Sequence, residues 1–322
     1  MRIQRLFIPL IILLCFFAVQ SCKKSDGPTP DPTPVVMPDT LGVGWTKKII
    51  SGENLGDVFF NSATTGFLTG NQIYKSTDGG SSWLSVLSNG GAVNIFMTND
   101  GKAFFTDFAS RVIKTIDGGN NFVNASIVGQ ASDVFFIDNL TGYCVTRENF
   151  VYNSIDAGLT WTKIITTGLP LGSGYSSISC INNSTGLIAN DAGIYKTAGS
   201  FANWQQATIS GGTNSNFFSL YAVSASIIYA ANTHAEIFKS VDGGANFSFI
   251  KKVGVDGYTD VHFITDQEGY VSSGRHIFKT TDGGLNWTTV VSLGEGGIVE
   301  LHFSDANHGW ACGGNTVLTF KQ

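Results

Sequence analysis

The sequence has little charge and no excess of basic residues. Only 13% of its residues are charged, against about 25% in typical soluble proteins, and 19 Lys and Arg stand against 24 Asp and Glu. Nucleic-acid-binding domains normally carry a basic surface, so we do not expect this chain to bind DNA or RNA. Apolar residues make up 43%, which argues against disorder. The 39 glycines and 12% aromatic residues favour short strands joined by tight turns over a helical bundle.

Cysteine pairs are also missing. The five cysteines are an odd number, and no two are spaced as Cys-x-x-Cys, which excludes a zinc knuckle and a dithiol redox motif. Cys144, Cys180 and Cys312 fall within strand-like runs, so we expect them to be buried free thiols. We expect no cofactor.

The first 21 residues have the features of an export signal. Arg2 and Arg5 precede an apolar run over residues 6–19, which is shorter than the roughly 20 residues of a membrane-spanning helix. Ser21 and Cys22 follow and resemble the lipobox of bacterial lipoproteins. The resemblance implies that Cys22 is lipidated and anchors the protein to a membrane. A plain signal peptide with an incidental cysteine is the alternative.

Residues 22–43 have the composition of a linker. Five of the seven prolines lie here, and only Pro170 lies further along the chain. A proline-rich chain extends by about 3.1 Å per residue, so the linker could hold a domain roughly 60 Å from a membrane. We therefore expect a signal peptide over 1–21, a lipidated linker over 22–43 and a folded domain over 44–322. The expected location is the cell envelope at the outer membrane, facing either the periplasm or the cell surface.

An eight-residue pattern recurs along the folded domain. It begins with Ser or Thr, has Asp two residues later and then glycine, and ends in Trp or Phe. The aspartates are Asp78, Asp117, Asp156, Asp242 and Asp282, and the closing aromatic residues are Trp83, Phe122, Trp161, Trp204, Phe247 and Trp287, of which Trp204 ends a degenerate copy. These aromatic residues are 39, 39, 43, 43 and 40 positions apart. Such a period, with four strand-like runs in each repeat, predicts the blades of a β-propeller.

The two ends of the repeat array predict how the ring closes. The last repeat has three strand-like runs and ends before a fourth. Trp45 begins an isolated run of the fourth type, 38 positions before Trp83. The N-terminal strand should therefore complete the last blade, which leaves no open array with exposed sheet edges. The predicted fold is all-β, a seven-bladed propeller of four-stranded blades.

The recurring pattern resembles the Asp-box, also called the bacterial neuraminidase (BNR) repeat. Its Asp can accept hydrogen bonds from N–H groups of its own turn, its glycines permit positive φ, and its aromatic ring can pack between blades. One aspartate per blade places these carboxylates around a ring, too far apart to share an ion. We therefore assign them a structural role.

The whole repeat is more specific than the box. It reads Asp-Val-x-Phe, then Gly with an aromatic residue, then Ile-Tyr/Phe-Lys-Ser/Thr-x-Asp-Gly-Gly-x-x-Trp. Over residues 44–322 it is similar to the repeat of the photosystem II stability/assembly factor family and its non-photosynthetic bacterial relatives. This resemblance implies a scaffold that binds partners during assembly of membrane complexes, and it does not imply photosynthesis. Sialidases also contain the box, so the box alone assigns no activity.

The predicted strand order separates the two faces of the ring. With strands A to D counted outward, the A–B and C–D loops share the Asp-box face, and the B–C loops and D–A connections share the opposite face. The first positions of the seven A strands include four acidic residues, Asp57, Asp133, Asp260 and Glu300, beside Asn94, Ser177 and Ser219. These residues either cap the D–A turn of their own blade or attract cations to the channel mouth.

Three arginines are predicted on the same face. Arg111, Arg147 and Arg275 fall in or beside B–C loops, and sialidases bind a sugar carboxylate with three arginines. Their Arg-Ile-Pro motif is absent here. Tyr175 and Tyr258 are candidates for a Tyr nucleophile, but no spacing singles out either of them with a Glu partner. Solvated arginines on three separate blades are the simpler interpretation.

Two Asp/Glu-x-His pairs have residue types that can bind a metal ion. Asp260-x-His262 and Glu300-x-His302 lie on neighbouring inner strands, and imidazole with carboxylate suits a transition metal. Inner strands of adjacent blades diverge at the channel, so we expect no metal site.

These features together predict a monomeric, lipid-anchored propeller that binds a protein or glycan of the envelope and catalyses no reaction. Tyr175, with Phe217 and Phe218, could add an aromatic contact patch, and core packing is the alternative for the two phenylalanines. The alternative function is that of a carbohydrate-active enzyme, a sialidase or another glycoside hydrolase, that works on the face with the B–C loops. Convergence of the three arginines would favour the enzyme.

Overall fold

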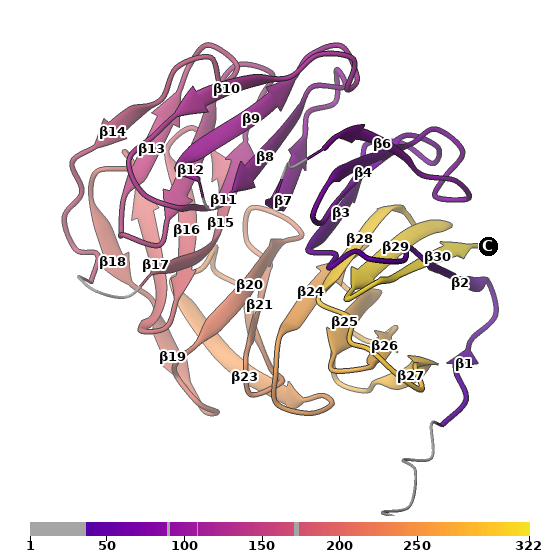
Figure 1. Ribbon diagram of the computed structural model, residues 1–322. Helices are drawn as coiled ribbons and strands as arrows, with labels where there is room; N and C mark the ends of the chain where they lie inside the picture. Colours follow the sequence, from indigo (N-terminus) through magenta and orange to yellow (C-terminus); the bar gives the residue numbers. More distant parts are fainter. Residues whose placement is uncertain (1–36, 89–90, 108, 171–173) are drawn as a thin grey trace, which may run out of the picture. The chain divides into compact units, whose positions relative to one another are not determined.

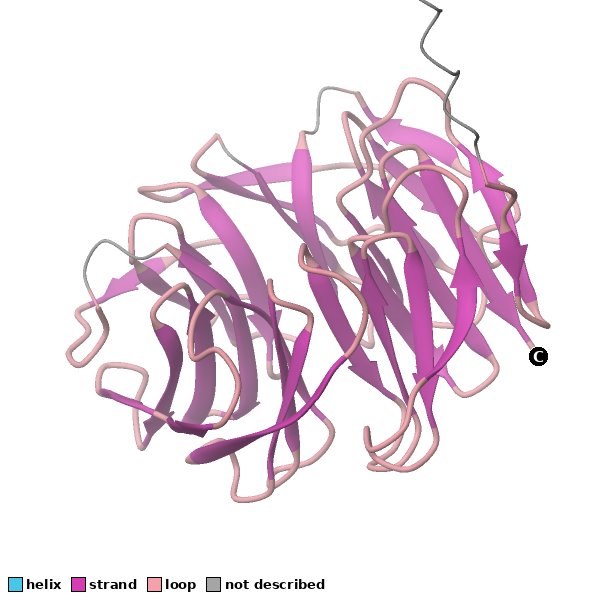
Figure 2. Ribbon diagram, turned by 90° about the horizontal axis from the view of Figure 1, so that it is seen from below, coloured by secondary structure: helices cyan, strands magenta, loops and turns pink. Residues whose placement is uncertain are grey.

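The computed structural model describes residues 37–322, apart from 89–90, 108 and 171–173. Cys22, the export signal and most of the proposed linker lie outside the described residues. Where the chain is described, its secondary structure consists of 30 strands in seven sheets and includes no helix (Figures 1 and 2). A helix with the length and apolar character needed to span a bilayer is therefore not found in that part of the chain.

The seven sheets are the seven predicted blades. In each of them strand A is innermost, and B, C and D follow outward as an antiparallel meander. Blade 1 consists of β3 (Asp57–Phe60), β4 (Gly66–Thr69), β5 (Ile73–Ser76) and β6 (Leu84–Leu87). Blade 2 consists of β7 (Ala92–Met97), β8 (Ala103–Asp107), β9 (Arg111–Thr115) and β10 (Val123–Ser126). Blade 3 consists of β11 (Ala131–Phe136), β12 (Gly142–Thr146), β13 (Val151–Ser154) and β14 (Thr162–Ile164). Blade 4 consists of β15 (Tyr175–Asn182), β16 (Thr185–Asn190), β17 (Gly193–Ala198) and β18 (Trp204–Gln206). Blade 5 consists of β20 (Phe217–Ala222), β21 (Ile228–Asn232), β22 (Glu236–Ser240) and β23 (Asn246–Lys252). Blade 6 consists of β24 (Thr259–Phe263), β25 (Gly269–Ser273), β26 (His276–Thr280) and β27 (Thr288–Ser292).

Blade 7 joins the two ends of the domain. It contains β28 (Glu300–Asp305), β29 (His308–Gly313) and β30 (Thr316–Lys321), and its outer strand is β2 (Trp45–Ile49). β2 pairs antiparallel with β30, from Trp45 opposite Phe320 to Ile49 opposite Thr316. The predicted closure of the ring by the N-terminal strand is confirmed, and the fold is a seven-bladed β-propeller.

Two blades carry a fifth strand that the repeat pattern did not predict. β1 (Thr40–Leu41) pairs antiparallel with β27 of blade 6, and β19 (Thr208–Ser210) pairs parallel with β23 of blade 5. The β1 edge is held further by Asp39, which accepts from the Gly294 N–H at 2.8 Å and forms an ion pair with Lys47 at 2.8 Å. The last residues of the segment that composition assigned to the linker are thus part of the folded domain.

The core is divided into seven apolar clusters, one between each pair of neighbouring blades. At four boundaries, an aromatic ring of strand B stacks on a Phe of strand A in the next blade. The stacked pairs and their centroid separations are Phe104–Phe136 at 3.8 Å, Tyr229–Phe263 at 3.5 Å, Tyr270–Phe303 at 4.2 Å and Trp310–Phe60 at 3.6 Å. Large buried rings contribute most of the apolar area per residue, so these stacks hold blade to blade.

The Gly-aromatic step of the repeat has a steric reason. Gly309 begins the buried part of β29 directly over the ring of Phe303, and a Cβ atom on it would lie 2.3 Å from that ring. Gly66 stands in the same relation to Phe60, also at 2.3 Å. Glycine lets the A-strand ring fold back against strand B, and this places the ring where the strand B ring of the preceding blade can stack on it.

Each box aspartate organises its own C–D turn. In blade 1, Asp78 Oδ1 accepts from the Ser76 hydroxyl at 2.9 Å and from the Ser82 N–H at 2.8 Å, while the Ser76 hydroxyl accepts from the Gly80 N–H at 2.8 Å. The same bonds recur at Asp117, Asp156, Asp242 and Asp282. The Ser82 hydroxyl, which donates to Asp78 Oδ2 at 2.6 Å, and the other hydrogen bonds of this turn lower the pKa of Asp78 to about 2. The carboxylates are fully used in turn formation on the outer part of the ring.

Candidate binding site

The seven A strands surround a cavity of about 710 Å³ at the centre of the ring. Its lining also includes residues that precede those strands, among them Asn54, Gly56, Tyr258 and Val299. The D–A connections enter the A strands at this end. The cavity therefore reaches the face of the propeller opposite the C–D turns.

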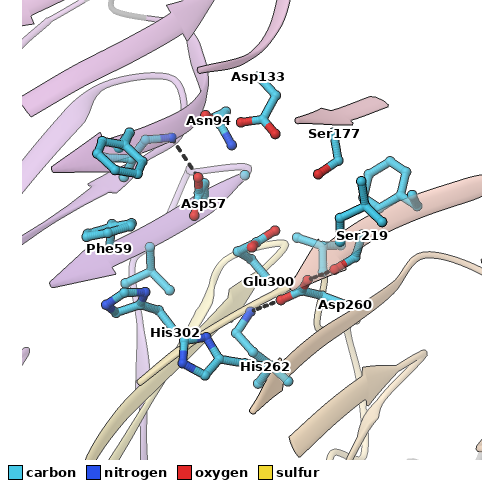
Figure 3. A pocket seen from close by; sticks show the side chains of 18 of the residues that line it. Asp57, Phe59, Asn94, Asp133, Ser177, Ser219, Asp260, His262, Glu300 and His302 are labelled. Carbon is cyan, nitrogen blue, oxygen red and sulfur yellow. Dashed lines mark hydrogen bonds between the residues drawn. The ribbon is translucent and has the colours of Figure 1, made fainter. Parts of the chain in front are cut away.

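A ring of polar side chains lies around the cavity at the start of the A strands. Its members are Asp57, Asn94, Asp133, Ser177, Ser219, Asp260 and Glu300, all of which line the cavity (Figure 3). The structure thus brings together the complete set that equivalent positions in the repeats had indicated, four carboxyl groups included. Among the described residues, the lining contains no Lys and no Arg.

The aspartates of this ring bond to the next blade. Asp57 Oδ2 accepts from the Ile95 N–H at 2.6 Å, and Asp133 Oδ2 accepts from the Ile178 N–H at 2.8 Å. In each case the donor follows the ring position of the neighbouring blade. The interpretation that these residues cap the D–A turn of their own blade does not describe these bonds, because the acceptor and donor belong to different blades.

Blades 5 to 7 are linked in the same way. Asp260 Oδ2 accepts from the Leu301 N–H at 2.9 Å, and its other oxygen accepts from the Ser219 hydroxyl at 2.6 Å. The Val261 N–H in turn donates to the Ser219 hydroxyl oxygen at 3.3 Å. The polar ring is therefore also a structural girdle around the channel. No sequence signal indicated this role, because the donors are backbone groups of another repeat.

Burial keeps these carboxyl groups near their neutral form. It raises the pKa of Asp57 to about 8 and that of Asp133 to about 7, although the N–H bonds to both oppose the shift. Burial also raises the pKa of Asp260 and Glu300, and the negative charges of Asp260, Asp57 and Asp133 raise that of Glu300 further. The four groups are close enough to influence one another, because the charge of one carboxylate raises the pKa of its neighbours.

A second layer of aromatic rings lies two residues further along the same strands. Its members are Phe59, Phe96, Phe135, Tyr221, His262 and His302, with Ser179 at the equivalent place in blade 4. Neighbouring rings touch in sequence, with centroid separations of 4.9 Å for Phe135–Phe96, 5.6 Å for Phe96–Phe59, 4.1 Å for Phe59–His302, 5.5 Å for His302–His262 and 4.3 Å for His262–Tyr221. The rings form an arc over six blades, broken at blade 4. We call it the aromatic arc.

The two histidines belong to this arc and are held neutral. Burial lowers the pKa of His302 to about 4 and that of His262 well below its usual value. A His302 ring nitrogen, Nε2, bonds the Phe60 carbonyl at 2.7 Å, and His262 Nε2 bonds the Tyr221 hydroxyl at 3.1 Å. The described residues hold no group of three or more His, Cys, Asp or Glu arranged to bind a metal ion.

The three arginines are not part of the cavity lining. Arg111 forms an ion pair with Asp107 of its own blade, and Arg275 Nη1 donates to the Gly294 carbonyl at 2.6 Å. Arg147 follows β12 of blade 3, and its N–H donates to the Gln130 carbonyl at 3.0 Å. They stand on blades 2, 3 and 6.

The aromatic candidates divide between core and rim. Phe217 is a core residue, with 1% of its surface exposed, whereas Phe218 lines the cavity and packs against Tyr258 at a centroid separation of 4.8 Å. Tyr258 is 58% exposed and marks the rim of the cavity. Tyr175 begins β15, and its side chain lies outside the described part of the structure. The sequence offered Tyr258 only as one candidate for a Tyr nucleophile, and its place at the rim was not predicted because nothing in the repeat distinguishes its loop.

Comparisons with known proteins bear on the fold. No protein-family profile matches this chain, and no curated protein matches it. Similar solved structures include YCF48 bound to D1 peptide, with a TM-score of 0.71 and 14% identity, covering 87% of this chain and 97% of that one. YCF48 from Cyanidioschyzon merolae has a TM-score of 0.70 and 17% identity, covering 86% and 98%. Virginiamycin B lyase from Staphylococcus aureus has a TM-score of 0.72 and 9% identity, covering 86% and 99%. At these identities the likeness shows the β-propeller fold alone.

Proposed function

We propose that this protein is a non-catalytic scaffold of the Asp-box type, and that it binds a protein partner of the cell envelope on the face with the D–A connections. The observation that carries this proposal is the central cavity of about 710 Å³, which reaches that face and has partly exposed aromatic side chains at its rim. Aromatic residues around a polar cavity are typical of sites that bind other molecules. The likeness to a propeller solved with a bound peptide supports a protein partner over a glycan.

The placement of charged groups favours binding over catalysis. A sialidase-like site would need Arg111, Arg147 and Arg275 around one ligand, but none of the three lines the cavity, and Arg111 and Arg275 contact groups of their own blades. Asp57, Asp133 and Asp260 are each committed to a backbone N–H of the next blade. We therefore do not carry the glycoside hydrolase alternative forward.

We also propose that lipid on Cys22 anchors the protein to the outer membrane and that the proline-rich linker holds the propeller away from it. The support is the Ser21-Cys22 step after an apolar run and the five prolines that follow. Processing at Cys22 should be blocked by globomycin, and Cys22→Ala should release the protein from the membrane fraction. Normal processing with globomycin, or an unchanged membrane attachment of the variant, would exclude this anchor.

Site-specific photo-cross-linking in cells tests the binding face. A photoreactive residue at Tyr258, on the rim of the cavity in blade 6, should give a defined protein adduct. The matched control is Leu285, which is 65% exposed on the Asp-box turn of the same blade and should give none. Equal adducts from both positions would contradict the assigned face. Adducts to glycan would contradict the proposal of a protein partner. Turnover of sialosides or polysaccharides by the purified protein would contradict the proposal of a non-catalytic scaffold.

A further inference from the structure

The central cavity has an unusual balance of charge. Its lining contains four carboxyl groups, at Asp57, Asp133, Asp260 and Glu300, and, among the described residues, no Lys or Arg. Among the described residues, the basic groups of that lining are the two imidazoles of the aromatic arc, at His262 and His302. Buried carboxylates normally have a cationic partner or remain protonated. The described lining therefore supplies no cation to stabilise these carboxyl groups in their charged form, so a cationic ligand would supply the missing counter-charge.

Two further features of the same cavity are independent of the carboxyl groups. The aromatic arc lies two residues deeper along the A strands, about 7 Å beyond the polar ring. Aromatic rings attract cations through their negative faces, and most strongly where water is excluded. In addition, the Asn94 Oδ1 atom is buried without a hydrogen-bond partner, in a side chain that lines the cavity. A buried acceptor of this kind is stabilised when a donor reaches it.

We infer that the cavity binds a primary ammonium group on an aliphatic stem, as found in the lysine side chain of a partner protein. The inference rests on the proposed scaffold function and names the chemistry by which the partner is recognised. The ammonium group would lie within the polar ring, with carboxyl oxygens of Asp57 and Glu300 and the Asn94 oxygen as acceptors. The aromatic arc would lie below it.

The rim accounts for the stem of the ligand. Phe218 and Tyr258 line the mouth of the cavity and pack on each other. Their rings offer apolar surface to the methylene groups of a lysine side chain, which normally lie along such surface while the charged end stays with polar partners. A compact cation without a stem would leave these contacts unused.

The charge of the lining makes the expected binding depend on pH. The carboxyl groups must lose a proton to pair with ammonium, and the pKa of Asp133 is raised to about 7 and that of Asp57 to about 8. The other titratable lining groups are His262, His302, Tyr221, Tyr258 and Cys180. Burial lowers the pKa of both imidazoles, to about 4 in His302, and raises that of Tyr221 to about 12 and that of the Cys180 thiol. Affinity for a cation should therefore rise from pH 6 to pH 8.5.

Isothermal titration of the purified protein tests the inference with two capped pentapeptides, Gly-Gly-Lys-Gly-Gly and the same sequence with Nε-acetyl-lysine. Only the first should bind, and its affinity should be about 75-fold higher at pH 8.5 than at pH 6.0 if binding requires loss of the Asp57 proton, whose pKa is about 8. The double variant Asp57→Asn, Glu300→Gln should lose at least about tenfold in affinity at pH 8.5. Asp305→Asn changes an exposed acid outside the lining and should leave affinity unchanged.

A free diamine separates the two sources of the same chemistry. Cadaverine has the ammonium group and the stem without a peptide, so tighter binding of cadaverine than of the lysine peptide would assign the cavity to a small amine and would retain the cation site. The inference is overturned if neither compound binds saturably, if the acetylated peptide binds as well, or if affinity falls with rising pH. The pH comparison uses the unmodified protein, so it remains decisive if the double variant does not fold.

Failure of this inference can be told apart from failure of the proposed function. The photoreactive residue at Tyr258 can be combined with the double variant. If the partner adduct persists undiminished in that background, the scaffold function stands and the cation site is wrong. If the adduct is lost in the double variant and retained with Asp305→Asn, both stand.

Discussion

The carboxyl group of Asp133 should make the propeller less stable as pH rises, and this effect can be measured. The Asp133 side chain is 9% exposed, and its oxygens accept from the Val134 N–H at 2.7 Å and the Ile178 N–H at 2.8 Å. Burial raises its pKa from 3.8 to about 7. Below pH 4 the carboxyl is protonated in both the folded and the unfolded chain. Between pH 4 and pH 7 only the folded chain keeps the proton, so the free energy of unfolding falls as pH rises.

The size of the effect follows from the two pKa values. The interval from 3.8 to about 7 corresponds to about 4 kcal/mol of unfolding free energy, lost progressively up to pH 7 and constant above it. His262 and His302 act in the opposite direction, because the folded chain holds them neutral and the unfolded chain does not. The total stability curve therefore mixes both effects. Only the difference between the protein and an Asp133 variant isolates the carboxyl.

The Asp133→Asn variant provides that difference. Its amide has one oxygen where the carboxyl has two, so one of the two N–H groups loses its acceptor and the variant should be less stable by about 1–2 kcal/mol at pH 4. The amide does not ionise, so the variant should gain on the unchanged protein by about 4 kcal/mol between pH 4 and pH 7 and become the more stable of the two. Guanidinium unfolding followed by tryptophan fluorescence measures both, and Asp266→Asn, at an exposed acid of blade 6, is the control. A difference that stays constant from pH 4 to pH 8 would refute the reasoning.

Three further predictions concern packing. Gly309→Ala should destabilise the domain by about 1–3 kcal/mol, because its Cβ atom would lie 2.3 Å from the Phe303 ring. In the control Gly297→Ala, the new Cβ atom would meet nothing closer than 3.6 Å, so the loss of stability should be small. Thermal melting compares the two variants, and equal melting temperatures would contradict the steric argument. Trp45→Ala should lower the free energy of unfolding by about 3–5 kcal/mol in chemical denaturation. The indole is 6% exposed and packs on Phe320 and Phe303 where β2 closes the propeller. A loss below about 1 kcal/mol would show that closure does not depend on this side chain. The domain should not react with a thiol reagent while it is folded and should react fully in denaturant. The reason is that Cys144, Cys180 and Cys312 are buried free thiols, and burial raises the pKa of each of them. Rapid reaction of the folded protein would contradict this prediction.

Much of the architecture was predictable because its causes are local. The Ser/Thr-x-Asp-x-Gly pattern forms a turn through bonds among neighbours in sequence, as in Ser76, Asp78 and Gly80, so every copy marks a C–D hairpin. The spacing between copies then counts the blades, and the missing fourth strand at one end matches the isolated one at Trp45. Equivalent positions in the repeats also placed the acidic residues at one level of the channel.

The predictions that failed or stayed open involve contacts between repeats. β19 was not predicted, because a three-residue segment takes its pairing from the edge of β23 and not from its own pattern. The bonds from Asp57 to Ile95 and from Asp133 to Ile178 could not be predicted, because a backbone N–H has no signature in sequence. Convergence of the arginines was left open, since loop positions do not say where a long side chain ends.

The amino-acid sequence by itself determined the blade, its number and its closure, because turn chemistry, glycine spacing and the period of apolar residues act within a single repeat. Only the tertiary structure decided that the first residues of the inner strands join each blade to the next, and that six rings from six blades touch in one arc. The tertiary structure also decided that four carboxyl groups share a cavity whose described lining has no basic counterpart except two neutral imidazoles. These are properties of the space between blades, which depends on how seven similar sheets are rotated about a common axis.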